Sequence, residues 1–287
     1  MENSRSMALL WVRRQNDYKE IINGLISKEK DILATLANLP VQHTFIKKLE
    51  LLSLCMDIIS YYVLLSDLSK VFTKVKSELY LNEARKYVFK ALIYTEEVVS
   101  AYIDVPFSEY EERLKVIANF PDEQRLILMN KLGYSIDSVI DALGENSKWK
   151  WSYPEWKGRY AVVLKNFIDL KKYVAEFDPR SVGYQERFLM MRRAKSSLSE
   201  VADAYRQKYE LTSQRIDDIK LALQYLGALK RIHAYLGENE DVEAVKKKYE
   251  VWKAKMEDDL RKQEHHQNAA KNNKDAANTK KKGFFGF

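Results

Sequence analysis

The sequence predicts an all-α protein, and three observations support this fold class. Only nine glycines and five prolines occur in 287 residues, which is few for a chain rich in strands and tight turns. Hydrophobic residues make up 46% of the chain, enough to bury one large core or two smaller ones. Apolar residues also recur at alternating three- and four-residue steps, as in packed helices. We therefore expect an elongated antiparallel helical bundle with coiled-coil-like long helices and a disordered C-terminal tail.

The first expected helix ends at Pro40, because proline lacks the backbone donor that a continuing helix needs. Two polar residues, Gln15 and Glu29, interrupt its apolar seam. The seam itself consists of Trp11, Tyr18, Ile22, Leu25, Ile32, Leu36 and Leu39. A second apolar-periodic segment follows over residues 41–74, and the tight turn between them should make the two helices antiparallel.

Two further helices complete an N-terminal helical bundle, which we expect over residues 1–146. Ser77 is placed to cap a helix that runs to about Ile103. Another helix should begin at Pro121, because proline tolerates the first turn and the two acids that follow favour the positive end of the helix dipole.

A Trp-rich joint is expected over residues 147–160, where three of the five tryptophans lie: Trp149, Trp151 and Trp156. Lysines alternate with these rings. The interpretation we favour is a small core that locks two helical halves together, since tryptophan buries a large area. The alternative is a secondary surface that binds a partner, stacks on nucleic-acid bases or lies at a membrane interface. A helix should follow this joint and run to about Phe177.

Residues 161–262 are expected to form a long-helix C-terminal bundle. One heptad frame extends from Tyr184 to Leu226, and an unbroken helix over 182–236 would be about 80 Å long at 1.5 Å per residue. A division at residues 212–213 is the alternative. Such long helices can pair within the chain or with a second copy, so a homo-oligomer is also open.

The tail, residues 263–287, contrasts with the rest of the chain. From Lys262 onward there are six lysines and two acids, which leaves 42 basic and 39 acidic residues in the body. Three phenylalanines stand at the end, where no core can form around them. We expect this end to bind a protein partner or an anionic membrane surface. The binding residues would be Lys280, Lys281, Lys282, Phe284, Phe285 and Phe287.

The sequence contains none of the catalytic or metal-binding motifs sought. The His-Glu-x-x-His, P-loop, dinucleotide-binding and Gly-x-Ser-x-Gly patterns are missing, and no histidine follows a glutamate at the three-residue spacing of di-iron bundles. We therefore predict no catalytic residues, no metal site and no cofactor. Cys55 is expected to be a buried thiol and His233 a packed histidine. The acidic doublets Glu96-Glu97, Asp217-Asp218 and Asp258-Asp259 are expected on solvated faces.

These observations favour a non-enzymatic α-helical scaffold or adaptor that binds protein partners and whose KKKGFFGF tail is a docking peptide. We expect it to be cytoplasmic, because no signal-peptide cleavage pattern is present and the most apolar window, Leu51–Leu65, is shorter than a membrane span. The alternative is a peripheral protein at the inner membrane face that uses the Lys/Phe tail. Nucleic-acid binding is the least favoured hypothesis, because most of the basic excess belongs to the tail.

Overall fold

The computed structural model describes the backbone of residues 2–212 and 214–283, and the side chains of residues 9–212 and 214–264. The described backbone forms α-helices and two short 3-10 helices and contains no strand, which confirms the predicted all-α class. The chain divides into two compact units, Met1–Val201 and Ala202–Phe287. Because α8 crosses this boundary, its first part belongs to unit 1 and its last ten residues to unit 2.

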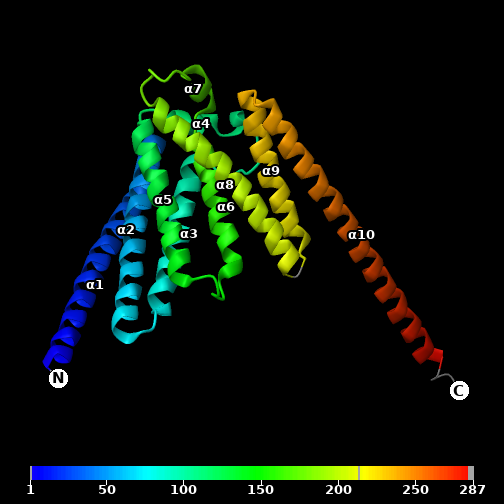
Figure 1. Cartoon of the computed structure of the whole chain (residues 1–287), viewed down its shortest axis with the longest axis horizontal. Helices are drawn as coiled ribbons and strands as arrows, with labels where there is room; N and C mark the ends of the chain where they lie inside the picture. Colours follow the sequence, from blue (N-terminus) through cyan, green and yellow to red (C-terminus); the bar gives the residue numbers. More distant parts are fainter. Residues whose placement is uncertain (1, 213, 284–287) are drawn as a thin grey trace. The chain divides into compact units, whose positions relative to one another are not determined.

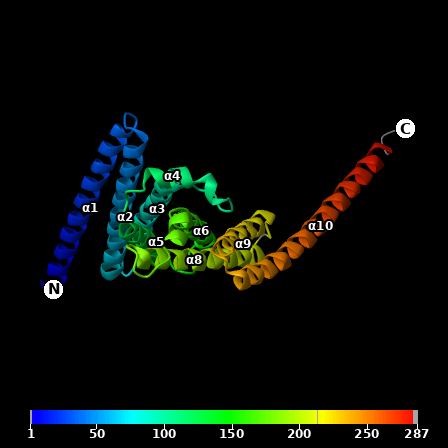
Figure 2. The same ribbon diagram turned by 90° about the horizontal axis from the view of Figure 1, so that it is seen from above.

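Unit 1 is a helical bundle centred on α2, which lies between α1 and the pair α3 and α5 (Figures 1 and 2). The helix α6 packs against α3 and α5. The elements of unit 1 are α1 (Glu2–Leu36), α2 (Val41–Thr73), α3 (Glu78–Val99), η1 (Phe107–Glu109), α4 (Glu111–Val116), α5 (Asp122–Leu143), η2 (Lys150–Ser152), α6 (Tyr153–Asn166), α7 (Leu170–Ala175) and α8 (Tyr184–Leu211).

The first two helices are antiparallel, as the turn at Pro40 predicts. Trp11 at the start of α1 contacts Phe72 at the end of α2, with ring centroids 6.1 Å apart, and Tyr18 contacts Tyr61 at 5.7 Å. These pairs show that the chain reverses direction between the helices. The coiled-coil character of the long helices stays a prediction.

The central position of α2 explains its composition. Among the described helices, α2 alone is long and apolar enough, by length and composition, to cross a membrane. The window expected to fall short of a span, Leu51–Leu65, is therefore part of a longer apolar helix. Half of the most apolar 18-residue stretch is buried inside the structure, and α2 contacts helices on several sides. Burial in the bundle thus gives the helix a reason to be apolar all round.

The helix after the Trp-rich segment is shorter than predicted. It ends at Asn166 instead of near Phe177, and α7 begins after a break. The buried guanidinium of Arg125 donates to the carbonyl oxygen of Phe167 at 3.1 Å, and the carboxylate of Asp169 accepts a hydrogen bond from the backbone N–H of Lys172 at 3.0 Å. These bonds satisfy the backbone groups that the break exposes, so the chain can turn there.

Residues 147–160 lie within unit 1, whose boundary falls at residue 201 instead of in the predicted joint. The reason is that α6 packs back onto α3 and α5, so the helices before and after the Trp-rich segment share one core. The two compact units thus meet inside α8, while the expected bundles at 1–146 and 161–262 stay a prediction. The heptad pattern of α8 continues across residue 201, so the sequence shows no boundary there.

The predicted 80 Å rod does not form, because the heptad region is two helices. α8 ends at Leu211 and α9 (Ile216–Leu236) begins after a turn in which Gln214 has φ of +50°. In unit 2, Tyr205 and Tyr225 stack with ring centroids 5.6 Å apart. The division between α8 and α9 lies beside Thr212, which interrupts the heptads. A division at residues 212–213 was the alternative to an unbroken helix.

Unit 2 consists of the end of α8, α9 and α10 (Asn239–Gly283), with α9 packed against α10. Gly237 ends α9 with φ of +74°, a conformation that glycine adopts without strain, and its N–H donates to the carbonyl of Ala234. The core of this unit contains Tyr205, Tyr209, Ile219, Leu223, Leu226, Ile232 and Trp252. Most of the predicted disordered tail, 263–287, lies outside the residues whose side chains the structure describes.

Candidate functional site

The predicted binding residues of the tail, Lys280–Lys282, Phe284, Phe285 and Phe287, lie outside the described side chains. Within unit 2, Asp259 and Gln263 of α10 contact residues that precede α9. The hydroxyl of Tyr209 donates to the Asp259 carboxylate at 2.7 Å, and the Gln263 amide donates to the carbonyl of Gln214 at 3.4 Å. Twenty-four residues follow Gln263, and the aromatic end is among them.

The three tryptophans of the Trp-rich segment lie in different environments. Trp156 is completely buried, and its ring meets that of Phe89 edge to face at 5.9 Å, so Trp156 belongs to the core and not to a surface. Trp149 is half-buried, with the guanidinium of Arg85 3.3 Å above its ring. Trp151 is also half-buried. Only these last two tryptophans are partly accessible to a partner.

The remaining candidates from the sequence lie largely where their residue types suggest. Cys55 is fully buried, and burial raises the pKa of its thiol well above the usual range, so the thiolate needed for reactivity is disfavoured. Within unit 2, His233 is buried beside the turn to α10. Its Nδ1 lies 2.5 Å from a carboxylate oxygen of Glu238 and 3.6 Å from one of Asp241. The first distance is that of a hydrogen bond, which fixes the ring.

The acidic doublets do not converge on a common point, because neighbouring side chains on a helix point about 100° apart. Glu96 forms a bidentate pair with Arg159 at 2.7 Å, and Glu97 contacts Lys48. The expectation of a solvated face is wrong for Asp218, which is buried and pairs with Lys208 at 2.8 Å. Tertiary pairing with the end of α8 makes this burial tolerable.

A polar cluster around the buried Glu29 connects α1 to α3 and was not predicted as a cluster. We call Glu29, Tyr87, Lys90 and Tyr94 the Glu29 cluster. The ammonium of Lys90 lies 2.9 Å from the Glu29 carboxylate, and the hydroxyls of Tyr87 and Tyr94 donate to it at 3.3 and 3.2 Å. Burial, followed by the charge of Glu29, raises the pKa of both tyrosines above the usual range. Every oxygen of Glu29 therefore has partners, as a structural carboxylate requires.

A second polar cluster joins α5, α7 and α8 around Asp122. Its carboxylate accepts hydrogen bonds from the ammonium of Lys172 at 2.9 Å and from the buried guanidinium of Arg187 at 2.7 Å. These two cations keep the pKa of Asp122 below its usual value, although burial opposes them. Gly183 lies against this cluster with φ of +78°. This cluster fixes the start of α8 on unit 1.

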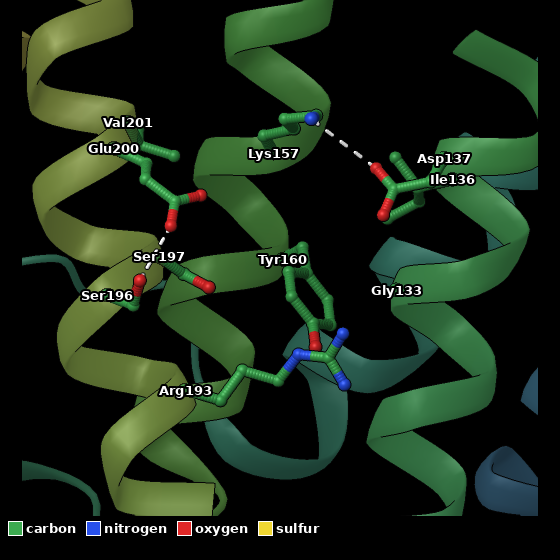
Figure 3. Close-up of a pocket in the computed structure, with 10 residues that line it drawn as sticks. All are labelled: Gly133, Ile136, Asp137, Lys157, Tyr160, Arg193, Ser196, Ser197, Glu200 and Val201. Atoms are coloured by element: carbon green, nitrogen blue, oxygen red, sulfur yellow. Dashed lines mark hydrogen bonds and ion pairs between the residues drawn. The ribbon is translucent and has the colours of Figure 1, made fainter. Parts of the chain in front are cut away.

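A third candidate site is a cavity of about 200 Å³ between α5, α6 and α8 in unit 1 (Figure 3). We call it the Arg193 cavity. Four charged side chains and three hydroxyl groups line it, together with small and apolar residues. The lining residues are Gly133, Ile136, Asp137, Lys157, Tyr160, Arg193, Ser196, Ser197, Glu200 and Val201.

Two of the charged groups in the Arg193 cavity have neutral partners. The guanidinium of Arg193 donates to the amide oxygen of Asn130 at 2.5 Å, and the Glu200 carboxylate accepts a hydrogen bond from the hydroxyl of Ser196 at 2.6 Å. The other two charges form an ion pair, with Lys157 Nζ 3.4 Å from the carboxylate of Asp137. Among the described residues, Arg193 and Glu200 are thus two opposite charges of this cavity with neutral partners, and both side chains are exposed.

The hydroxyl of Tyr160 is a third unusual group in the Arg193 cavity. The residue is only 7% exposed, and among the described residues its buried oxygen has no hydrogen-bond partner. Burial raises the pKa of Tyr160 to about 12, and the nearby charge of Arg193 opposes this rise. The close packing of Tyr160 against Gly133, where a Cβ would lie 2.9 Å from the hydroxyl oxygen, leaves no room for a larger residue.

No pattern in the sequence identified the Arg193 cavity. Its residues come from three helices and their spacings match no motif. The signal available was limited to Arg193, Ser196 and Glu200, which share one face of α8 because they are three and four residues apart. That spacing is common on solvated helix faces, so it carries little information without the tertiary structure.

The fold and these sites define an all-α bundle protein in which several ion pairs join neighbouring helices. The chain belongs to the TP0443 family, whose model matches residues 9–260. The match covers most of both units and ends before the tail. No curated protein matches the chain.

Proposed function

We propose that this protein is a non-enzymatic α-helical scaffold or adaptor that binds protein partners, with the segment Lys280–Phe287 as its docking peptide. The observation that supports the proposal is the composition of this segment, in which three lysines precede three phenylalanines.

The chemistry of the tail suits a weak and reversible contact. Burying each of Phe284, Phe285 and Phe287 in a partner groove would contribute roughly 1.5–3 kcal/mol, before the cost of ordering the tail is subtracted. The three preceding lysines add attraction toward an acidic rim. The two units would serve as the frame that carries this peptide, and pairing of its long helices with a second copy would raise the avidity.

A peripheral membrane protein is the second candidate, favoured by the same three lysines. Each lysine near an anionic leaflet contributes about 1 kcal/mol, and phenylalanine rings insert beside the headgroups. This hypothesis predicts dependence on lipid charge and requires no protein groove. The half-exposed Trp149 and Trp151 provide a secondary surface for either kind of partner.

The decisive experiment is affinity capture from cell extract with three forms of the protein. The first is the intact chain, the second ends at Lys282, and the third carries Phe284→Ala, Phe285→Ala and Phe287→Ala. We expect the same partners to be lost from the second and third forms, while their melting temperatures equal that of the intact chain. Identical partner lists for all three forms would contradict the docking peptide.

Vesicle flotation separates the membrane hypothesis from the protein hypothesis. The intact chain and the form that ends at Lys282 are mixed with vesicles of neutral lipid and with vesicles that contain anionic lipid, whose negative surface attracts lysine clusters. Tail-dependent flotation with the anionic vesicles alone would favour the membrane candidate. We expect no flotation that depends on the tail.

A further inference from the structure

The Arg193 cavity lies in unit 1 and is independent of the tail, so what it binds is a separate question from partner docking. Arg193 and Glu200 are seven residues apart on α8, which is two helical turns and about 10 Å along the axis. Both therefore lie on one face of the helix. Figure 3 shows their charged ends on opposite sides of the space in front of Tyr160 and Ser197. The cavity is polar, with its positive and negative ends separated.

The partners of these two charges leave both available for a ligand. Arg193 is held by the neutral amide of Asn130, and Glu200 by the neutral hydroxyl of Ser196. A guanidinium offers further N–H donors in a planar fork that matches a carboxylate, and a glutamate has further lone pairs for an ammonium group. The pair between Lys157 and Asp137 is already neutral, so it adds polarity without adding net charge.

The hydroxyl of Tyr160 gives an independent indication of a ligand. A buried hydroxyl without a hydrogen-bond partner destabilises the folded state, and such groups in folded proteins call for an explanation. This hydroxyl lies beside the guanidinium of Arg193 in Figure 3, at the positive end of the cavity. An anionic group that draws Arg193 toward the cavity centre would give Tyr160 an acceptor.

We propose that the Arg193 cavity binds a small zwitterion of the amino-acid class. Its carboxylate contacts Arg193 and the hydroxyl of Tyr160, and its ammonium group contacts Glu200. The cavity volume of about 200 Å³ accommodates a small ligand of this class. Simple anions would satisfy only Arg193, and simple amines only Glu200, so both should bind more weakly than a molecule that carries both charges.

The test measures binding to the intact protein by calorimetry with five probes. The zwitterions are glycine, β-alanine and γ-aminobutyrate, which differ in the separation of their charges. Acetate and ethylamine carry one charge each. We expect at least one zwitterion to bind at least 10-fold more tightly than acetate and ethylamine. Equal affinity for acetate and the best zwitterion would overturn the proposal, as would the absence of binding by all three zwitterions at 10 mM.

Variants then place the ligand. Arg193→Gln and Glu200→Gln should each weaken binding of the best zwitterion at least 10-fold, and Tyr160→Phe should weaken it about 3-fold. Lys131→Gln, which removes an exposed cation of α5 that does not line the cavity, should leave affinity unchanged. Melting temperatures check that each variant is folded. Unchanged affinity in both Arg193→Gln and Glu200→Gln would place the ligand elsewhere and overturn the assignment.

Discussion

The Glu29 cluster and the Arg193 cavity are both polar regions of unit 1, but they differ in how their charges are satisfied. Glu29 is 2% exposed and has an ammonium and two hydroxyls as partners. Arg193 and Glu200 are exposed and have one neutral partner each. A buried charge with all its partners inside the protein is typical of structure, whereas charges left available around a hollow indicate a ligand.

The largest expected effect comes from breaking the Glu29 cluster. Glu29→Ala should lower the free energy of unfolding by about 3 kcal/mol, because it leaves the hydroxyls of Tyr87 and Tyr94 without their acceptor and creates a cavity. Urea unfolding measures this change. The matched variant in the Arg193 cavity, Glu200→Ala, should cost less than about 0.5 kcal/mol, since an exposed residue is removed. Equal losses for the two variants would contradict the distinction between structural and available charges.

A second comparison uses the cluster around Asp122. Gly183→Ala should cost about 2 kcal/mol, because its φ is +78° and the new Cβ would lie 2.6 Å from a carboxylate oxygen of Asp122 and 2.9 Å from Arg187. The control is Gly144→Ala, where φ is +83° and no atom lies within 4 Å. In Gly144→Ala only backbone strain destabilises the folded state, so thermal unfolding should show that the free energy of unfolding falls by about 1 kcal/mol. A larger loss at Gly144 would show that the Asp122 cluster tolerates the extra methyl group.

Two tyrosine substitutions should have opposite signs. Tyr87→Phe removes a hydrogen bond to Glu29 and should destabilise unit 1 by about 1 kcal/mol. Tyr160→Phe removes a buried hydroxyl that has no partner among the described residues, so it should be neutral or stabilise by up to about 1 kcal/mol. Chemical unfolding of both variants in the absence of ligand gives the comparison. A loss of 1 kcal/mol or more for Tyr160→Phe would show that its hydroxyl is satisfied in the folded protein.

The last comparison concerns pH dependence. The pKa of Tyr160 is raised to about 12, above the value of about 10 in an unfolded chain. Between these two values the unfolded chain loses the proton and the folded protein keeps it. The stability that the protonated hydroxyl gives the folded protein is therefore fully present below pH 10 and is lost as the pH rises toward 12. Stability of the wild-type protein should therefore fall over this range more steeply than that of Tyr160→Phe. The difference is at most about 1.4 kcal/mol per pH unit. Parallel curves would mean that the hydroxyl titrates normally.

Much of the helical order was predictable because helix boundaries depend on local chemistry. The turn at Pro40, the start of α5 after Pro121 and the end of α9 at Gly237 follow from proline geometry and glycine's tolerance of positive φ. The break after Asn166 was not predictable, because the bond from Arg125 that satisfies it comes from a different helix. Local sequence patterns therefore predicted where helices begin and end, while hydrogen bonds between distant residues decided where a helix is interrupted.

The two polar residues in the seam of α1 show the same limit. In the sequence, Gln15 and Glu29 interrupt the apolar seam of the first helix, but the sequence does not show which residues they contact. In the structure, the amide of Gln15 donates to the hydroxyl of Tyr80 at 2.7 Å, and Glu29 reaches Lys90, so both interruptions are contacts with α3. Paired in this way, they fix the position of α1 along the bundle, as buried polar residues do in coiled coils.

The sequence by itself determined the all-α class, the periodic seams and the basic aromatic end, because each depends on residue type and spacing along one chain. Only the tertiary structure decided which charged side chains pair with other charged side chains and which remain available to a ligand. Arg193 and Tyr160 lie 33 residues apart and on different helices, so their meeting depends on how α6 and α8 pack. Side chains from separate helices create the Arg193 cavity, and no single stretch of sequence records that arrangement.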